Sequence, residues 1–331
     1  MDRRKFLSFS TISLIGCALM PSSILSACKK EDSSNPGKKG SEIEAATGHF
    51  SIMQVSSTSG TTIGGQKFSD NIGNSYIIKT SGGKVIVLDG GPEGDAPHLR
   101  SLLKNKYGGT VDQWWVSHPH SDHIGAMLEI LRQPQGITVK EVYHSRFPEG
   151  LGKLEQGTWN KYAVPLYDIL DNSTTIKTTD LQSPGGLFEI DGIYIKVVGV
   201  TNPELTVNTE GTSPYNNSSM IIRVWDDSKS FLFLGDAQQE CGDKLLTKNS
   251  RFYKYLTADY VQVAHHGQQG VKESFYKSIT FKKCLWPTPE WVFNPKLSSL
   301  QTENTKRWLR NKGVAEDCWI VSCLEKDWYL E

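Results

Sequence analysis

The feature that most constrains the fold is a cluster of ligand-type side chains between an expected strand and an expected helix. Three histidines and one aspartate fall within six positions, namely His118, His120, Asp122 and His123. The apolar residues 114–116 precede them as a strand end, and residues 124–131 follow with the apolar spacing of a helix. A strand that enters a helix through such a turn points several short side chains at one place. This turn is therefore predicted to be a binding site.

The residue types in this turn favour a divalent metal ion as the ligand. His118 and His120 are two positions apart, so on an extended backbone they project to the same side. Asp122 and His123 fall at the helix start, where exposed N–H groups favour a carboxylate. Imidazole and carboxylate together suit zinc, manganese or iron. A polar turn whose histidines only cap the helix is the alternative, and it accounts poorly for four such residues at this spacing.

Length and net charge exclude few classes of protein, but they do not favour a non-specific nucleic-acid-binding protein. The chain has 331 residues, with 36 Lys and Arg against 36 Asp and Glu, so its formal net charge is zero. This length is enough for one large domain or two small ones. Neutrality gives non-specific nucleic-acid binding no support, although it leaves room for a local basic groove.

The N-terminal residues predict export and a lipid anchor. Basic residues at positions 3–5 precede a largely apolar stretch, as in a signal peptide. Residues 25–28, Leu-Ser-Ala-Cys, resemble a bacterial lipobox, in which cleavage leaves Cys28 as the lipid-carrying N-terminus. An ordinary signal peptide or a membrane anchor is the alternative. We therefore divide the chain into a signal peptide (1–27), a flexible tether (28–46) and one folded domain (47–331).

Four cysteines lie in the expected domain, and none is predicted to bind metal. They are Cys241, Cys284, Cys318 and Cys323, with no C-x-x-C spacing among them. In apolar surroundings a free cysteine behaves as a small hydrophobic residue. Export permits disulfides, and the sequence leaves any pairing open.

One further polar residue, Asp89, is expected to act close to the cluster. It closes the apolar strand 84–89 and is followed by two glycines, which allow a tight turn. From there its carboxylate can hydrogen-bond an imidazole that binds metal, which orients the ring. A simple Asp-Gly turn is the alternative.

The motif at residues 116–125 resembles the signature of the metallo-β-lactamase superfamily, and the resemblance extends from about residue 50 to the C-terminus. It implies a mixed α/β fold, a four-layer αββα sandwich. The order of expected elements fits, because two β-rich halves are each flanked by helices. Their central strands are near-continuous apolar runs, as expected when both faces of a sheet are covered.

The resemblance also assigns ligands for two divalent ions, expected to be zinc, with manganese or iron as alternatives. The implied ligands are His118 and His120 for the first metal, Asp122, His123 and His265 for the second, and Asp236 as a bridge between them. Neighbours on an extended backbone point opposite ways, so only one residue of the pair His265-His266 can readily bind metal. With His265 as the ligand, His266 would face the substrate or a carboxylate behind the metal ligands.

One histidine of the superfamily pattern is missing. Much of the superfamily has a further ligand of the first metal before the bridging aspartate, but His144 is the only histidine in that interval and comes too early. Full occupancy of the first site is therefore in question. This absence, with Asn-Asn-Ser-Ser at 216–219 and the later His-His-Gly, narrows the resemblance to one branch. That branch contains the exported domain of competence DNA-uptake proteins and the phosphorylcholine esterases that act on teichoic acid.

The expected chemistry follows from charge. A metal ion lowers the pKa of bound water from about 15.7 to about 7, so a metal-bound hydroxide is available near neutrality. Two ions can clamp a phosphoryl oxygen while the hydroxide attacks, and Asp122 can orient that hydroxide. Protonation of the leaving group needs a further side chain, for which His266 and Tyr215 are the candidates.

These inferences predict a lipid-anchored, exported, metal-dependent hydrolase of a phosphodiester, located in the periplasm or at the cell surface. The substrate would be a small molecule, an envelope polymer or nucleic acid, the last without support from charge. Two alternatives stay open. One is a hydrolase of the same fold that acts on a carboxylic ester, lactone or thioester, and the other is a non-catalytic envelope-binding lipoprotein.

Overall fold

Two seven-stranded sheets form the centre of the protein. The computed structural model describes residues 43–200, 213–247 and 251–331, all within the compact unit Lys39–Glu331. The predicted signal peptide, Cys28 and most of the tether lie outside the described residues. Within the described ranges, no helix is both long and apolar enough to cross a membrane.

Each sheet combines an antiparallel part with a parallel part. In spatial order, the first sheet contains β10 (Lys177–Asp180), β9 (Glu141–His144), β7 (Gln113–Trp115), β5 (Val85–Asp89), β4 (Ser75–Thr80), β1 (Phe50–Gln54) and β18 (Trp328–Leu330). The second contains β11 (Leu187–Ile190), β12 (Ile193–Gly199), β13 (Ile221–Trp225), β14 (Ser230–Phe233), β15 (Tyr260–Gln262), β16 (Lys283–Trp286) and β17 (Trp319–Val321). Strands β10, β9, β7 and β5 are parallel, as are β14 to β17.

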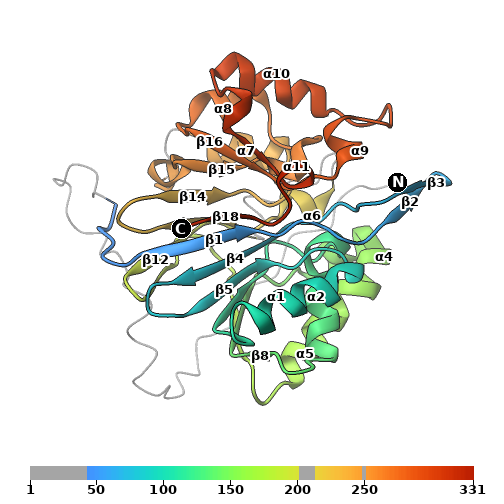
Figure 1. Ribbon diagram of the computed structural model, residues 1–331, viewed down its shortest axis with the longest axis vertical. Helices are drawn as coiled ribbons and strands as arrows, with labels where there is room; N and C mark the ends of the chain where they lie inside the picture. Colours follow the sequence, from blue (N-terminus) through green and yellow to red (C-terminus); the bar gives the residue numbers. More distant parts are fainter. Residues whose placement is uncertain (1–42, 201–212, 248–250) are drawn as a thin grey trace, which may run out of the picture. The chain divides into compact units, whose positions relative to one another are not determined.

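Helices cover the outer face of each sheet, which gives four layers (Figure 1). The first sheet is covered by α1 (Ala96–Asn105), α2 (Ser121–Arg132) and α5 (Val164–Asn172), and the second by α7 (Gln239–Leu245), α8 (Glu273–Ser278) and α10 (Thr302–Lys312). This arrangement confirms the predicted αββα sandwich.

Side-chain alternation along the central strands explains the layers. In β4, Tyr76 and Ile78 pack into the apolar layer between the sheets, whereas Ile77 packs against the helices. In β5, Ile86 and Leu88 face the other sheet. Because successive side chains of a strand point to opposite faces, a strand covered on both faces must be apolar throughout.

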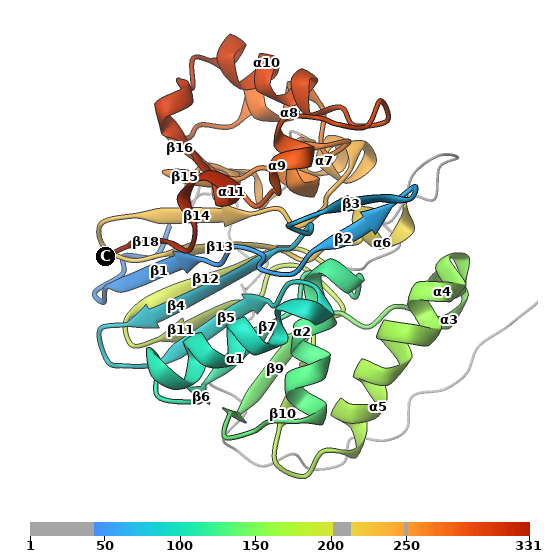
Figure 2. The ribbon, with the colours of Figure 1, turned by 45° about the vertical axis from the view of Figure 1, so that its right-hand side comes forward.

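Shorter elements connect and flank these layers. They are β2 (Thr61–Ile63), β3 (Gln66–Phe68), β6 (Thr110–Val111), β8 (Thr138–Val139), α3 (Glu149–Gly152), α4 (Gln156–Thr158), α6 (Pro214–Asn217), α9 (Glu290–Phe293), α11 (Ser322–Glu325), and the single turns η1 (Glu93–Asp95), η2 (Lys153–Glu155), η3 (Trp159–Ala163), η4 (Tyr253–Leu256), η5 (Ala264–Gly267) and η6 (Glu316–Cys318). The β2–β3 hairpin and the turns α3 and α4 project toward the same side of the protein as α6 (Figure 2).

The helical turns between residues 149 and 158 were not predicted. This stretch contains Gly150, Gly152 and Gly157, and glycine disfavours helix formation by about 1 kcal/mol relative to alanine. Packing requires one of them, because a Cβ at Gly152 would lie 2.0 Å from the Trp159 ring. Tertiary contacts therefore determine the local structure here.

Candidate metal centre

The ligand-type side chains gather where strands of both sheets end. His118 and His120 lie in the turn after β7, and Asp122 and His123 occupy the first turn of α2. Asp236 follows β14, and His266 lies in η5 after β15. Parallel strands place their carboxyl ends at one edge of a sheet, so these turns meet although they are far apart in the sequence.

The side chains form two groups that share Asp236. In one group the ligand atoms of Asp122, His123, Asp236 and His266 lie within 4.8 Å of one another. His123 Nε2 is 3.2 Å from Asp236 Oδ1, and His266 Nε2 is 3.1 Å from Asp122 Oδ2.

The other group consists of His118, His120 and Asp236. His118 Nε2 lies 3.0 Å from His120 Nδ1 and 3.9 Å from Asp236 Oδ2. Six residues were predicted to bind metal, and the structure brings five of them into these two groups.

The donor atoms fit divalent metal ions. His123 Nε2 and Asp236 Oδ1 are buried and have no hydrogen-bond partner in the described part of the chain. Buried polar atoms without a partner are rare in folded proteins, because each costs about 1–3 kcal/mol. A cation between them would satisfy both, and a set of imidazole and carboxylate donors suits zinc, manganese or iron.

Electrostatics keep the shared carboxylate ionised. Burial opposes the charged form of Asp236, but the imidazoles of His266 and His123 hold its pKa well below the ordinary value. Burial also opposes protonation of His266, yet the carboxylates of Asp236 and Asp122 raise its pKa to about 9. Burial, together with the neighbouring His123 ring, lowers the pKa of His118. The carboxylates of Asp236 and Asp122 therefore stabilise positive charge on the groups around them.

The adjacent histidines are placed differently from the prediction. His266, and not the predicted ligand His265, belongs to the four-residue group. The prediction relied on strand alternation through residue 264, but β15 ends at Gln262, and His265 and His266 both have positive φ, 50° and 55°. On this left-handed backbone both rings turn toward Asp236, with His265 Nε2 3.7 Å from Asp236 Oδ2.

The backbone around His266 fixes its ring. His266 Nδ1 lies 2.8 Å from the carbonyl oxygen of Pro287 and donates to it, so Nε2, which faces Asp122 and Asp236, is the nitrogen that would bind a metal. The indole nitrogen of Trp286 donates to the carbonyl oxygen of His266 at 2.8 Å. Gly267 packs on that indole, where a Cβ would lie 2.1 Å from the Trp286 nitrogen.

His265 lies beside the metal groups and faces polar side chains. Its Nε2 is 3.4 Å from Asn216 Nδ2 and 3.5 Å from Gln268 Nε2. It is partly exposed, whereas His266 is buried. This is the placement that the sequence argument expected for His266.

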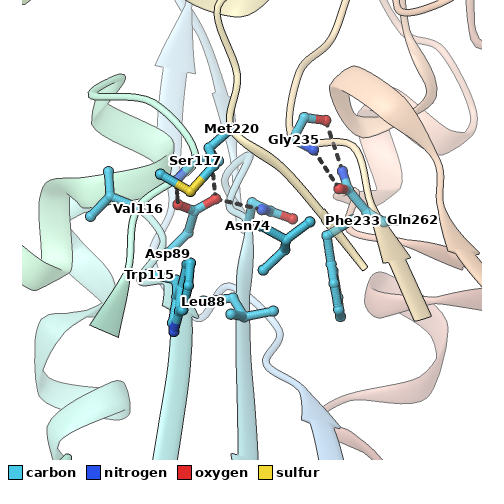
Figure 3. Close-up of a pocket in the computed structure, with 11 residues that line it drawn as sticks. Asn74, Leu88, Asp89, Trp115, Val116, Ser117, Met220, Phe233, Gly235 and Gln262 are labelled. Carbon is cyan, nitrogen blue, oxygen red and sulfur yellow. Dashed lines mark hydrogen bonds between the residues drawn. The ribbon is translucent and has the colours of Figure 1, made fainter. Parts of the chain in front are cut away.

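Asp89 connects the motif to its supporting strands. Its two oxygens accept hydrogen bonds from the Ser117 backbone N–H, the Ser117 hydroxyl, Asn74 Nδ2 and His123 Nδ1, each at 2.7 Å. The contact with His123 is the one that its predicted role requires. Figure 3 shows the Asn74 and Ser117 contacts among the residues that line a small pocket of about 20 Å³.

Two residues considered in the sequence lie elsewhere. Tyr215 is fully buried and donates its hydroxyl to the carbonyl oxygen of Gly152 at 3.1 Å, so it cannot protonate a leaving group. Its ring instead stacks on His120 at a centroid distance of 5.2 Å. His144 is buried, packs against Tyr167 and belongs to neither group.

Sequence reasoning missed Glu155, whose Oε2 lies 2.8 Å from His120 Nε2. It comes from η2, in the glycine-containing stretch that was not expected to be helical. No motif or periodicity marks this residue, and only the tertiary structure brings it to the centre.

Comparisons with known proteins agree with this geometry. The family model described as the metallo-beta-lactamase superfamily matches residues 69–275. The metallo-beta-lactamase fold protein YhfI from Bacillus subtilis is 14% identical, covers 85% of this chain and 98% of its own, and has a TM-score of 0.51. No curated protein sequence matches.

Two further solved structures have a TM-score of 0.49. A diphosphatase from the PhnP family is 14% identical, with 86% of this chain and 98% of that chain covered. Zn²⁺-bound PqqB from Methylobacterium extorquens is 10% identical, with 86% and 100% covered.

Proposed function

The chain belongs to the metallo-beta-lactamase superfamily, and on that basis we propose that it is a metal-dependent hydrolase of phosphodiesters. The observation that carries the proposal is the pair of ligand groups that share Asp236. The first group contains only two imidazoles and the shared carboxylate, His118, His120 and Asp236. A position left without a protein ligand has room for a substrate oxygen, and a phosphodiester presents two such oxygens.

The position of each residue in the centre suggests its role in hydrolysis. Divalent ions bound there would lower the pKa of water and polarise a phosphoryl oxygen. Asp122 is the most exposed member of the four-residue group, with 24% of its side chain accessible, so it can accept a proton from the attacking water. Asp236 is buried between the groups and orients the imidazoles around it.

His265 takes the substrate-side role in this proposal. It lies at the partly exposed rim, beside Asn216 and Gln268, where it can contact the leaving-group oxygen. His266 is held by Pro287 and belongs with the metal ligands. This reverses the roles that the sequence argument gave to the two histidines.

We further propose that the protein is exported and anchored through a lipid on Cys28. This proposal rests on the basic residues 3–5, the apolar stretch that follows them and the lipobox-like residues 25–28. An anchored enzyme would meet phosphodiesters of the cell envelope, and a small-molecule phosphodiester is the simplest probe for that class.

The test uses Zn²⁺- or Mn²⁺-loaded protein with bis-p-nitrophenyl phosphate, compared with a carboxylic ester and a panel of lactones. We expect hydrolysis of the phosphodiester and its loss in Asp236→Ala together with the metal. Hydrolysis of a lactone or ester without phosphodiester cleavage would overturn the substrate assignment.

Measuring the metal content of variants distinguishes the roles of His265 and His266. His266→Ala should lose metal and activity together, whereas His265→Ala should keep its metal and lose rate. If His265 protonates the leaving group, the loss should be about 10²–10⁴-fold on alkyl esters and smaller on p-nitrophenyl esters. Loss of metal in His265→Ala, with His266→Ala fully loaded, would restore the original assignment.

A further inference from the structure

We propose that Glu155 is a positioning residue that aims His120 at the first metal and supports this ligand group, which has no third histidine. The inference deepens the proposed function and rests on it. It is drawn from the contacts of Glu155, which link the metal centre to the helical turns of residues 149–163 and to α6.

The two nitrogens of the His120 ring have different partners. Nδ1 lies 3.0 Å from His118 Nε2, inside the first ligand group, and Nε2 lies 2.8 Å from Glu155 Oε2. An ionised carboxylate can only accept a hydrogen bond, so the proton of a neutral His120 is on Nε2. Nδ1 then presents a lone pair toward the position where a metal would bind.

Glu155 is itself held in place on its other side. Its Oε1 accepts a hydrogen bond from the Ser213 hydroxyl and faces the Tyr215 backbone N–H at 3.4 Å. The Tyr215 ring lies parallel to the His120 ring, with an interplanar angle of 6°. His120 is therefore restrained by a carboxylate at its edge and an aromatic ring on its face.

This restraint acts on the ligand group that has fewer protein ligands. The first group has three side chains, whereas the second has four, and Glu155 contacts only a member of the first. With few ligands, the orientation of each one contributes a larger share of the binding free energy. Removing Glu155 should consequently weaken the first metal and spare the second.

The experiment is a titration of metal-free protein with Zn²⁺ against a chromophoric chelator, which resolves two binding steps without any substrate. Glu155→Ala should lower the affinity of the weaker step by about 10–100-fold and leave the tighter step unchanged. Titration with Co²⁺ gives a second readout, because the absorption of the first site should appear only at higher metal concentration.

Two variants control for other effects. Glu149→Ala removes a carboxylate of the same stretch that is 68% exposed and pairs with Lys153, away from His120, so this variant should bind metal like wild type. Glu155→Gln keeps an oxygen that can accept from His120 but turns an amide N–H₂ toward Ser213, so its affinity should be intermediate. Melting temperatures in excess chelator should be similar for all variants, which shows that the loss is not unfolding.

The outcomes separate this inference from the proposed function. Wild-type affinity for both ions in Glu155→Ala would overturn the positioning role, as would an equal loss at both sites. A single binding step in the wild type would overturn it as well, because there would be no first metal to support. Failure to cleave any phosphodiester would overturn the proposed function alone, since the titration does not depend on turnover.

Discussion

Replacing Asp89 by asparagine tests how the centre is built. Four donors converge on the two oxygens of Asp89: two from Ser117, one from Asn74 and one from His123. Asparagine is nearly the same shape and tolerates the positive φ of this position, 53°. It offers only one oxygen, however, so at least one buried donor must face an N–H₂ group.

The contacts of Asp89 indicate how the asparagine amide would be oriented. Oδ2 receives three of the four donors and Oδ1 only the Ser117 N–H, so the new N–H₂ should take the Oδ1 position. One buried N–H then loses its acceptor, which costs about 1–3 kcal/mol of unfolding free energy. For a folded domain of this size that is about 2 °C in melting temperature for each kcal/mol.

The metal affinity should fall independently of this loss. An amide oxygen is a weaker acceptor than a carboxylate for the proton on His123 Nδ1, so the ring is less firmly oriented and less basic. Loss of such outer contacts typically costs about 10–100-fold in metal affinity. We expect this factor for the site that contains His123 in a Zn²⁺ titration.

The assay combines thermal melting in chelator with that titration, and Asp226→Asn is the matched control. Asp226 is a buried carboxylate that accepts from the Ser228 and Lys229 backbones, at the end of β13 away from the centre. It should lose stability and keep its metal affinity. Wild-type metal affinity in Asp89→Asn, or an equal fall in Asp226→Asn, would refute the role assigned to Asp89.

Three further predictions concern other parts of the chain. Gly267→Ala should lower the unfolding free energy by about 1–3 kcal/mol more than Gly313→Ala does. Both residues have positive φ, but only a Cβ at position 267 would press against the Trp286 indole. Equal losses in urea denaturation would contradict this. The hydrogen bond from His98 to Asp327 raises the pKa of His98, so its stabilisation is present below about pH 6.5 and is lost as pH rises above the raised value. The stability difference between wild type and His98→Gln should thus be at most about 1 kcal/mol at pH 6 and should shrink toward pH 8.5, and a difference that grows with pH would show that the pair does not act in this way. Cys28→Ser should move the exported protein from the detergent fraction to the aqueous one, and unchanged fractionation would reject the lipobox interpretation.

Sequence motifs predicted the metal-centre residues whose positions depend on nearby residues of the chain. The spacing of His118, His120, Asp122 and His123 places them in one turn whatever the rest of the chain does. Asp89 could be predicted because it ends an apolar strand, and a strand end at a sheet edge has few places to point. The four layers were implied by the family resemblance, and strands that are apolar on both faces fit them.

The sequence could not predict residues whose role depends on unusual backbone or distant contacts. Strand alternation placed His265 and His266 on opposite sides, whereas the structure turns both rings toward Asp236. No residue type marks the positive φ of these two residues or the end of β15. Glu155 lies in a stretch whose glycines disfavour helix, and its partner Ser213 is 58 positions away. Tyr215 was a candidate proton donor but is buried, since it packs against His120 and Phe147.

The pairing of β18 with β1 bears on how the protein is made. Leu330 pairs with Ile52 across the first sheet, so this sheet stays incomplete until β18 has been synthesised. Until then β1 is an open edge strand, and such edges readily pair with other chains. Contacts between such distant residues also form slowly. A chain whose β18 has not yet left the ribosome would therefore carry an uncapped sheet edge.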